Sequence, residues 1–236
     1  MSKQRLSEKV TEHLSGCVLE PAANAVRRSF RGQSLEQRQQ ERRQRLMQAG
    51  MQCYGTHGFF AVTVRDICAE ARLTERYFYE SFKNSELLFK AIYLAQIEQL
   101  QATIVQQTLA FAGQPNVQIL NSLKALLDFL QADPRSARIL FIDAPLVHEL
   151  HGGTVQEAVA TFDRLIMNWL LAVAPSLPER QRELSLIATG LNGYVIHLAM
   201  RWVSNGFRES HEEVLAACTL VYTSIFQSLG VLPAST

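Results

Sequence analysis

Basic and hydroxyl-bearing side chains gather in the segment TVRDICAEARLTERYFYESFK, residues 63–83. Arg76 stands between Glu75 and Tyr77, and Tyr79 follows two positions later. A guanidinium group can pair with a phosphate or bidentately with guanine, and a phenol hydroxyl can donate to a phosphate. These residue types indicate a surface that binds nucleic acid. The alternative is that Arg76 is an ordinary surface cation and that the tyrosines are half-buried aromatics of a helical bundle.

Charge is divided unevenly along the chain, although the net charge of the 236 residues is only +1. Residues 1–90 carry 15 Lys and Arg against 10 Asp and Glu, whereas residues 91–236 carry 8 against 12. The basic part includes a stretch of the kind that neutralises phosphates, made of Arg27, Arg28, Arg31, Arg38, Arg42, Arg43 and Arg45. A solvated basic segment is the alternative interpretation.

Other chemistries lack their usual sequence markers. The chain shows no nucleophile elbow, phosphate-binding glycine loop, HExxH motif or paired cysteines, so we predict that it is not an enzyme. The four cysteines are Cys17, Cys53, Cys68 and Cys218. Their spacing predicts reduced thiols and neither disulfides nor a zinc site. His148 and His151 lie three residues apart without an evident third ligand, so we expect no metal and no cofactor.

The pattern around the basic residues predicts the elements that position them. Apolar residues recur at helical spacing over Val64–Ala71. Thr63 is placed to cap that helix, with Asp66 at its third position, as in a capping box. After a turn, Thr74 is placed to cap a second helix.

The second predicted helix has one apolar face, which Phe78 and Phe82 share one turn apart. An earlier helix that includes Leu46 and Cys53 supplies a face for the two to pack on. Two short helices joined by a tight turn, the second exposing arginine and tyrosine, have the dimensions and chemistry of a unit that enters the major groove of DNA.

The segment AGMQCYGTHGFFAVTVRDICAEARLTERYFYESFKNSELLFKAI, residues 49–92, resembles the N-terminal domain of the TetR family of bacterial regulators. An aromatic-Gly-x-x-Gly-aromatic run is followed in order by Thr-Val-x-x-Ile, a helix turn, Tyr-x-x-Phe and Lys-Asn-x-Glu-x-Leu. The resemblance ends near residue 95. It implies a DNA-binding transcriptional regulator, usually a repressor, that acts as a dimer on a pseudo-palindromic double-stranded site.

The residues predicted to bind DNA are Arg42, Arg43, Thr63, Arg65, Thr74, Glu75, Arg76, Tyr77, Tyr79 and Lys83. Arg76 is the best candidate for reading a base, because its fork fits guanine. Tyr77, Tyr79 and Lys83 are assigned mainly to phosphates. The sequence departs from the family at Arg72, where a turn glycine is usual, and at Ser85, where a lysine is frequent.

For the whole chain we predict an all-α fold of about nine helices. A basic, flexible N-terminal extension covers residues 1–38, with a short amphipathic helix near its start. A three-helix helix-turn-helix domain covers residues 39–88, and a helical bundle for ligand binding and dimerisation covers residues 89–236. Within the bundle, the spacing of apolar residues predicts helices over 121–130, 136–143, 155–173, 179–203 and 212–229.

The rear domain is predicted to dimerise and to bind a small apolar effector. The last two helices are long and apolar, and small residues such as Gly190 and Gly193 let another helix approach, either in a homodimer or within the monomer. The candidate ligand-binding residues are Phe141, His148, Trp169, Tyr194, His197 and Trp202. We expect a repressor that the effector releases from DNA; a ligand-independent regulator or an activator with the same head is the alternative.

The start of the chain is polar and no run of eighteen uncharged apolar residues occurs, so a cytoplasmic protein without a membrane segment is expected.

Overall fold

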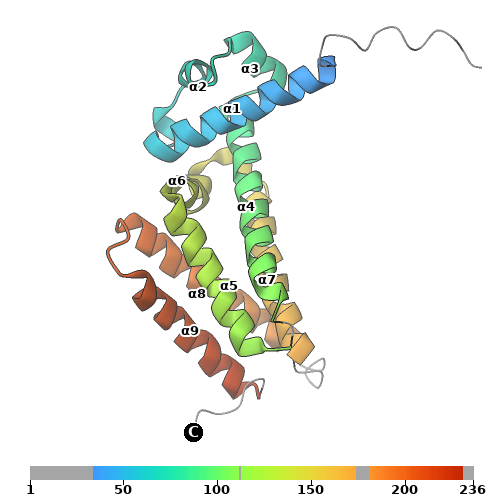
Figure 1. Cartoon of the computed structure of the whole chain (residues 1–236), viewed down its shortest axis with the longest axis vertical. Coiled ribbons are helices and arrows are strands. Elements are labelled where there is room, and N and C mark those ends of the chain that lie inside the picture. The colour runs from blue at the N-terminus through green and yellow to red at the C-terminus, as the bar shows by residue number, and fades with distance from the viewer. Residues whose placement is uncertain (1–33, 112, 174–180, 231–236) are drawn as a thin grey trace, which may run out of the picture. The chain divides into compact units, whose positions relative to one another are not determined.

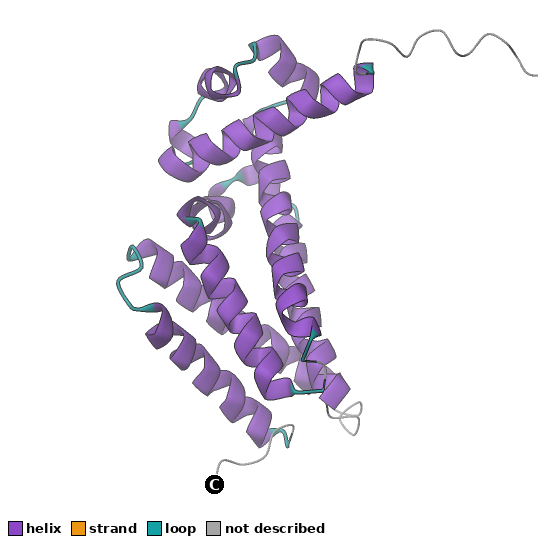
Figure 2. Cartoon of the chain, viewed as in Figure 1, coloured by secondary structure: helices purple, strands orange, loops and turns teal. Residues whose placement is uncertain are grey.

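The computed structural model describes residues 34–111, 113–173 and 181–230, and every regular element within these ranges is a helix (Figure 2). The α-helices are α1 (Leu35–His57), α2 (Val64–Ala71), α3 (Glu75–Ser81), α4 (Ser85–Leu109), α5 (Pro115–Ala132), α6 (Pro134–Ala137), α7 (Thr154–Val173), α8 (Gln181–Ser204) and α9 (His211–Ser228). The predicted all-α class and the number of helices are therefore confirmed.

The chain divides into two units, residues 1–38 and 39–236. In the first unit only residues 34–38 are described, and there the Ser34 hydroxyl and the Gln37 side chain each accept a hydrogen bond from the other residue's backbone N–H. The predicted amphipathic helix, most of the basic extension and Cys17 lie outside the described residues. None of the described helices combines the length and apolar character needed to cross a bilayer.

Helix α2 begins with the predicted capping box. The Thr63 hydroxyl accepts the Asp66 N–H at 3.3 Å, and the Asp66 carboxylate accepts the Thr63 N–H at 2.9 Å. The helix ends at Arg72, which has φ 52° and ψ 46°, a left-handed conformation that glycine adopts most easily. The Arg45 guanidinium donates to the Ala71 carbonyl at 2.5 Å and so supports the turn.

Helix α3 differs from expectation at its first turn. Thr74 occupies the N-cap position with an extended backbone, but its side chain makes no capping hydrogen bond, so the predicted side-chain cap is corrected. Residue type specifies the cap position, whereas the rotamer decides whether the hydroxyl reaches a backbone N–H. Phe78 and Phe82 are both buried, as their shared face predicts.

Helices α1–α3 pack around the N-terminal end of α4 (Figure 1). Tyr54 stacks edge-on against Phe89 with 5.5 Å between ring centroids, and its hydroxyl donates to the Ser85 carbonyl at 3.3 Å. The same cluster of buried side chains continues into Leu130 and Ile139 of the rear part. The domain boundary near residue 88 therefore stays a prediction.

The rear helices pack in pairs: α4 lies against α5, α7 against α8, and α5 against α9 (Figure 1). Their core includes Leu170, Leu184, Trp202 and Phe226. The helix predicted over residues 136–143 is not a continuous α-helix. Its first residues end the short α6, and Arg138–Asp143 form a π-helical segment, η2, followed by the 3₁₀ turn η3 (Ala144–Leu146) and then by η4 (His148–Leu150).

Candidate DNA interface and ligand cavity

Helix α3 presents one polar face to solvent. The Arg76 side chain is 84% exposed and Tyr79 is 57% exposed, whereas Phe78, which lies between them in the sequence, is buried. The Arg76 Nε donates to Glu80 Oε1 at 3.0 Å, one helical turn further on. The apolar face anchors the helix, and the polar face stays exposed.

Two arginines of α1 lie under α3 instead of projecting freely. The Arg42 guanidinium carbon lies 4.5 Å from the centre of the Tyr77 ring, and an Arg42 nitrogen lies 4.0 Å from Glu80. The Arg43 guanidinium covers the Phe82 ring at 4.1 Å and donates to the Ser81 carbonyl at 3.1 Å. These contacts orient α3 on α1 and add positive charge beside it.

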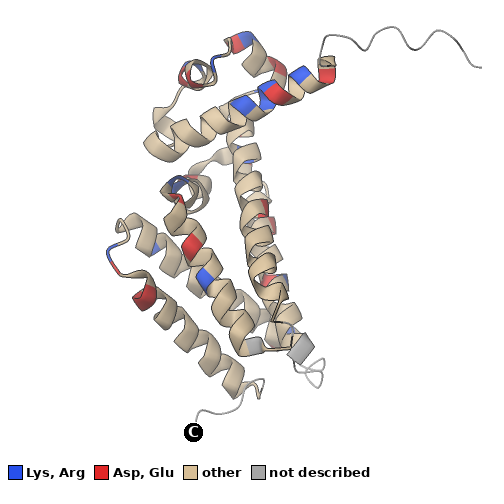
Figure 3. Cartoon of the chain, in the orientation of Figure 1, with Lys and Arg blue, Asp and Glu red and all other residues tan. Residues whose placement is uncertain are grey.

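The other residues predicted to bind DNA are all exposed: Thr63, Arg65, Thr74, Glu75 and Lys83. Figure 3 shows the Lys and Arg positions that α1 and the α2–α3 region bring together. The Thr63 hydroxyl also donates to the Asp66 carboxylate at 2.6 Å. That hydrogen bond, together with those of the α2 cap, keeps the pKa of Asp66 below its usual value.

A polar junction joins the end of α1 to the segment around η2. The carboxylate of Asp143, which is 4% exposed, accepts the Phe59 N–H at 3.1 Å and lies 3.5 Å from Arg138 Nε. Burial raises the pKa of Asp143, although the Phe59 hydrogen bond and the Arg138 charge act in the opposite direction.

Gly58 lets the chain approach this junction closely. It has φ 89°, and a Cβ there would lie 2.5 Å from the Arg138 side chain. Arg135 adds a second link across the junction, since its guanidinium donates to the Gln52 side chain. The head and the η2 segment are thus held by hydrogen bonds as well as by the shared core.

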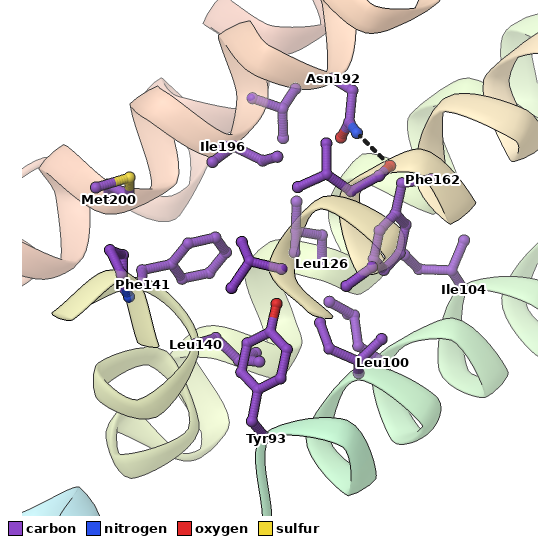
Figure 4. A pocket seen from close by; sticks show the side chains of 16 residues that line it. Tyr93, Leu100, Ile104, Leu126, Leu140, Phe141, Phe162, Asn192, Ile196 and Met200 are labelled. Carbon is purple, nitrogen blue, oxygen red and sulfur yellow. Dashed lines mark hydrogen bonds between the residues drawn. The ribbon is translucent and has the colours of Figure 1, made fainter. Parts of the chain in front are cut away.

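A cavity of about 260 Å³ lies among α4, α5, η2, α7 and α8 (Figure 4). Its walls are mostly aliphatic and aromatic, and the residues labelled around it in Figure 4 are Tyr93, Leu100, Ile104, Leu126, Leu140, Phe141, Phe162, Asn192, Ile196 and Met200. The connecting helix α4 and the η2 segment both contribute to the wall. The cavity therefore touches the two elements that also contact the head.

Of the predicted ligand-binding residues, Phe141 lines this cavity and the others lie elsewhere. Trp202 is buried, and its Nε1 donates to the Glu209 carbonyl at 2.9 Å. Tyr194 donates to the Ala217 carbonyl at 3.4 Å, and Trp169 lines a small neighbouring pocket that shares part of its wall with the cavity. His148 and His197 are exposed.

The part of the cavity wall that α4 supplies was not predicted from the sequence. Tyr93, Ile97, Leu100 and Ile104 lie one helical turn apart in succession, a spacing that places them on one face. That spacing was a usable signal, but it is also the spacing of any core-facing helix. Among the described residues, no three His, Cys, Asp or Glu side chains lie close enough together to hold a metal ion, and Cys53, Cys68 and Cys218 are free thiols.

The head and most of the chain each have counterparts among known proteins. Residues 46–92 match the family described as bacterial regulatory proteins, tetR family. No curated protein sequence matches the chain. A TetR-like transcriptional regulator from Rhodococcus sp. RHA1 aligns with 80% of this chain and 96% of its own, at 20% sequence identity and a TM-score of 0.60.

Two further solved structures have a similar fold. A putative transcriptional regulator from Pseudomonas aeruginosa PAO1 has 18% identity and a TM-score of 0.65, over 79% of this chain and 90% of its own. The fatty acid degradation regulator FadR from Bacillus halodurans has 14% identity and a TM-score of 0.64, over 76% and 93%.

The helices α1–α3 and the match over residues 46–92 define a helix-turn-helix DNA-binding head. The resemblance predicted from the sequence is thereby confirmed over residues 46–92, which match the family of bacterial regulators to which the segment was compared.

Proposed function

We propose that the protein is a dimeric repressor that binds a pseudo-palindromic operator and leaves it when a small apolar effector occupies the cavity. One observation carries this proposal: residues of α4 and η2 line the cavity, and these two elements also contact the head. A cytoplasmic location follows from this role, because the operator DNA lies there.

In this proposal α3 enters the major groove. Arg76 reads a base, and the exposed Tyr79 and Lys83 contact phosphates on either side. Arg42 and Arg43 act from beneath, since they position α3 and strengthen the positive potential there. Arg65, Thr63, Thr74, Glu75 and Tyr77 complete the proposed contact surface.

The proposed dimer forms through the outer faces of α8 and α9. Leu186 on α8 is 76% exposed and Leu220 on α9 is 67% exposed, so each offers a large apolar side chain to a partner helix. Gly190 and Gly193 have open space where a Cβ would stand, so a second helix can approach closely there. A two-fold dimer would set its two α3 helices about 34–36 Å apart, or at a multiple of that spacing, in grooves on one side of the operator.

The proposed switch passes through η2 and α4. Phe141 lines the cavity, and Asp143 two residues later holds the Phe59 N–H of the head. A ligand that prefers a different placement of Phe141 therefore also changes the placement of the head. By linkage, the factor by which effector weakens operator binding equals the factor by which operator weakens effector binding.

The test begins with selection of bound DNA from a random library, which should return a palindrome. Fluorescence anisotropy of the labelled operator is then titrated against a panel of metabolites and a host extract. We expect operator affinity to fall by about 5- to 150-fold with the effector, the usual range of such couplings. Recovery of a palindrome whose affinity no compound or extract changes would refute release by an effector and leave the DNA-binding function standing.

A further inference from the structure

The cavity wall contains no formal charge. None of its 16 lining residues is Asp, Glu, Lys, Arg or His. An ionised ligand group would lose its hydration on entry and find no compensating charge on the wall. The wall therefore selects against carboxylates, phosphates and ammonium groups.

Two polar side chains reach this apolar wall, and they differ in what they offer a ligand. Asn192 donates through Nδ2 to the Val159 carbonyl at 3.1 Å and to Asp163 Oδ1 at 2.6 Å. Both of its donors are used within the protein. Asn192 thus ties α8 to α7 and leaves no N–H for a ligand.

Tyr93 is in the opposite situation. The residue is 3% exposed and lines the cavity, and none of the hydrogen bonds found among the described residues uses its hydroxyl as a donor. Figure 4 shows its oxygen pointing into the cavity, on the side toward Leu126 and Phe141. Burial raises the pKa of Tyr93 to about 12, so the hydroxyl keeps its proton at neutral pH. Because the hydroxyl opens onto the cavity, an acceptor on a ligand placed there can take a hydrogen bond from it.

The size of the cavity sets a further limit. Its volume of about 260 Å³ is just below the range of roughly 300–1,000 Å³ that is usual for small-molecule sites. The occupant is therefore small, and most of its surface must be apolar to match the wall.

We propose that the effector is an uncharged molecule with an apolar body and a hydrogen-bond acceptor, such as a carbonyl oxygen, that accepts from the Tyr93 hydroxyl. This inference rests on the proposed effector-released regulator and deepens it by naming the ligand class.

Three probes of similar shape test separately whether the ligand needs a hydrogen-bond acceptor and whether it must be uncharged. Acetophenone carries the acceptor, cumene replaces the carbonyl by a CH–CH₃ group, and benzoate adds a negative charge. Met200 lies on the cavity wall (Figure 4), so the NMR signal of its methyl group reports occupancy. We expect the chemical shift of this methyl group to change with acetophenone or cumene and to reach a plateau as the cavity fills. Benzoate should leave the shift unchanged at the same concentrations.

Tyr93→Phe removes the donor while keeping the ring. In this variant acetophenone loses its hydrogen bond and cumene loses nothing. The dissociation constant of acetophenone divided by that of cumene should therefore rise by about three- to tenfold, which corresponds to one neutral hydrogen bond. Tyr222→Phe is the matched control, because it removes another buried hydroxyl that does not line this cavity. Its ratio should equal that of the unmodified protein.

Two results would overturn this inference alone: a ratio that Tyr93→Phe leaves unchanged, or benzoate binding as strongly as acetophenone. In both cases the cavity still binds small molecules and the proposed regulator stands. If none of the probes shifts the Met200 signal and none changes operator affinity, the effector-sensing function fails together with the inference.

Discussion

Among the described residues, Arg76 pairs with Glu80 at 3.0 Å, and in the proposed complex a base of the operator would be its second partner. An exposed ion pair of this i, i+4 kind is worth only about 0.3–0.5 kcal/mol. A bidentate contact with guanine discriminates against the wrong base by about 1–3 kcal/mol. The arginine can therefore exchange Glu80 for a base at little cost.

Arg76→Ala should weaken specific operator binding by about 1–3 kcal/mol and relax the preference at one base pair. Lys83→Ala is the matched comparison, because a phosphate contact should weaken all sequences equally and lower the salt slope by about one. Anisotropy titrations on operator and random DNA at several salt concentrations distinguish the two. Equal losses on both DNAs for Arg76→Ala would assign it to phosphate.

Helix α2 depends on its cap, because the first four N–H groups at its start, those of Thr63 and of the three residues after it, have no partners inside the helix. Thr63 satisfies one of these, and the Asp66 carboxylate satisfies the Thr63 N–H in return. The low pKa of Asp66 means that this stabilisation is complete above the ordinary aspartate pKa and is lost as the pH falls through the lowered value.

Thr63→Ala should destabilise the protein by about 1 kcal/mol, a typical effect of losing an N-cap. It should also raise the pKa of Asp66 toward its ordinary value, since the first cause of the low pKa is the Thr63 side chain. Thr63→Ser retains a hydroxyl and should behave like the unmodified protein. Chemical unfolding and an NMR titration of Asp66 check both effects; an unchanged Asp66 pKa in Thr63→Ala would contradict the assignment.

The junction between η1 (Phe59–Ala61) and η2 depends on Asp143. Asp143→Ala would leave the buried Phe59 N–H without a partner and should cost about 1–3 kcal/mol. Asp143→Asn keeps an acceptor and should cost less. Urea unfolding of the two variants provides the comparison, and equal costs would show that the Phe59 hydrogen bond contributes little.

The raised pKa of Asp143 gives the same junction a pH dependence. Between the ordinary aspartate pKa and the raised value, the folded state binds more protons than the unfolded state, so the free energy of unfolding falls as the pH rises through this window. Asp143→Asn removes this term. The stability of Asp143→Asn relative to the unmodified protein should therefore increase as the pH rises through the window, and a difference that does not change with pH would contradict it.

At the scale of the whole molecule, the proposed dimer surface includes the exposed leucines of α8 and α9. Replacing both with charge, as Leu186→Glu with Leu220→Glu, should prevent dimerisation and reduce operator affinity, because one head alone contacts half of the site. Leu109→Glu, at a leucine that is 68% exposed on α4, is the control. Sedimentation equilibrium should give a monomer for the double variant and a dimer for the control; a dimer in both would place the interface elsewhere.

The sequence by itself determined the head of this protein. Thr63 with Asp66, the spacing of Val64 to Ala71 and the pair Phe78 and Phe82 act over a few residues, so their consequences can be read from the order of the chain. The exposed side of α3 follows directly, because a helix with one buried face turns its other face to solvent. The long helices of the rear were predictable for the same reason.

Only the tertiary structure decided where the cavity lies and what lines it. Tryptophan and histidine suggested a ligand site by type, yet Trp202 fills the core and His197 faces solvent. A cavity is a property of the space between helices that are distant in sequence, and its aliphatic walls consist of the same residue types as a filled core. The π-helical turn at Arg138–Asp143 was equally hidden, since it brings Phe141 to the cavity and Asp143 to Phe59 through contacts made only after the helices have packed.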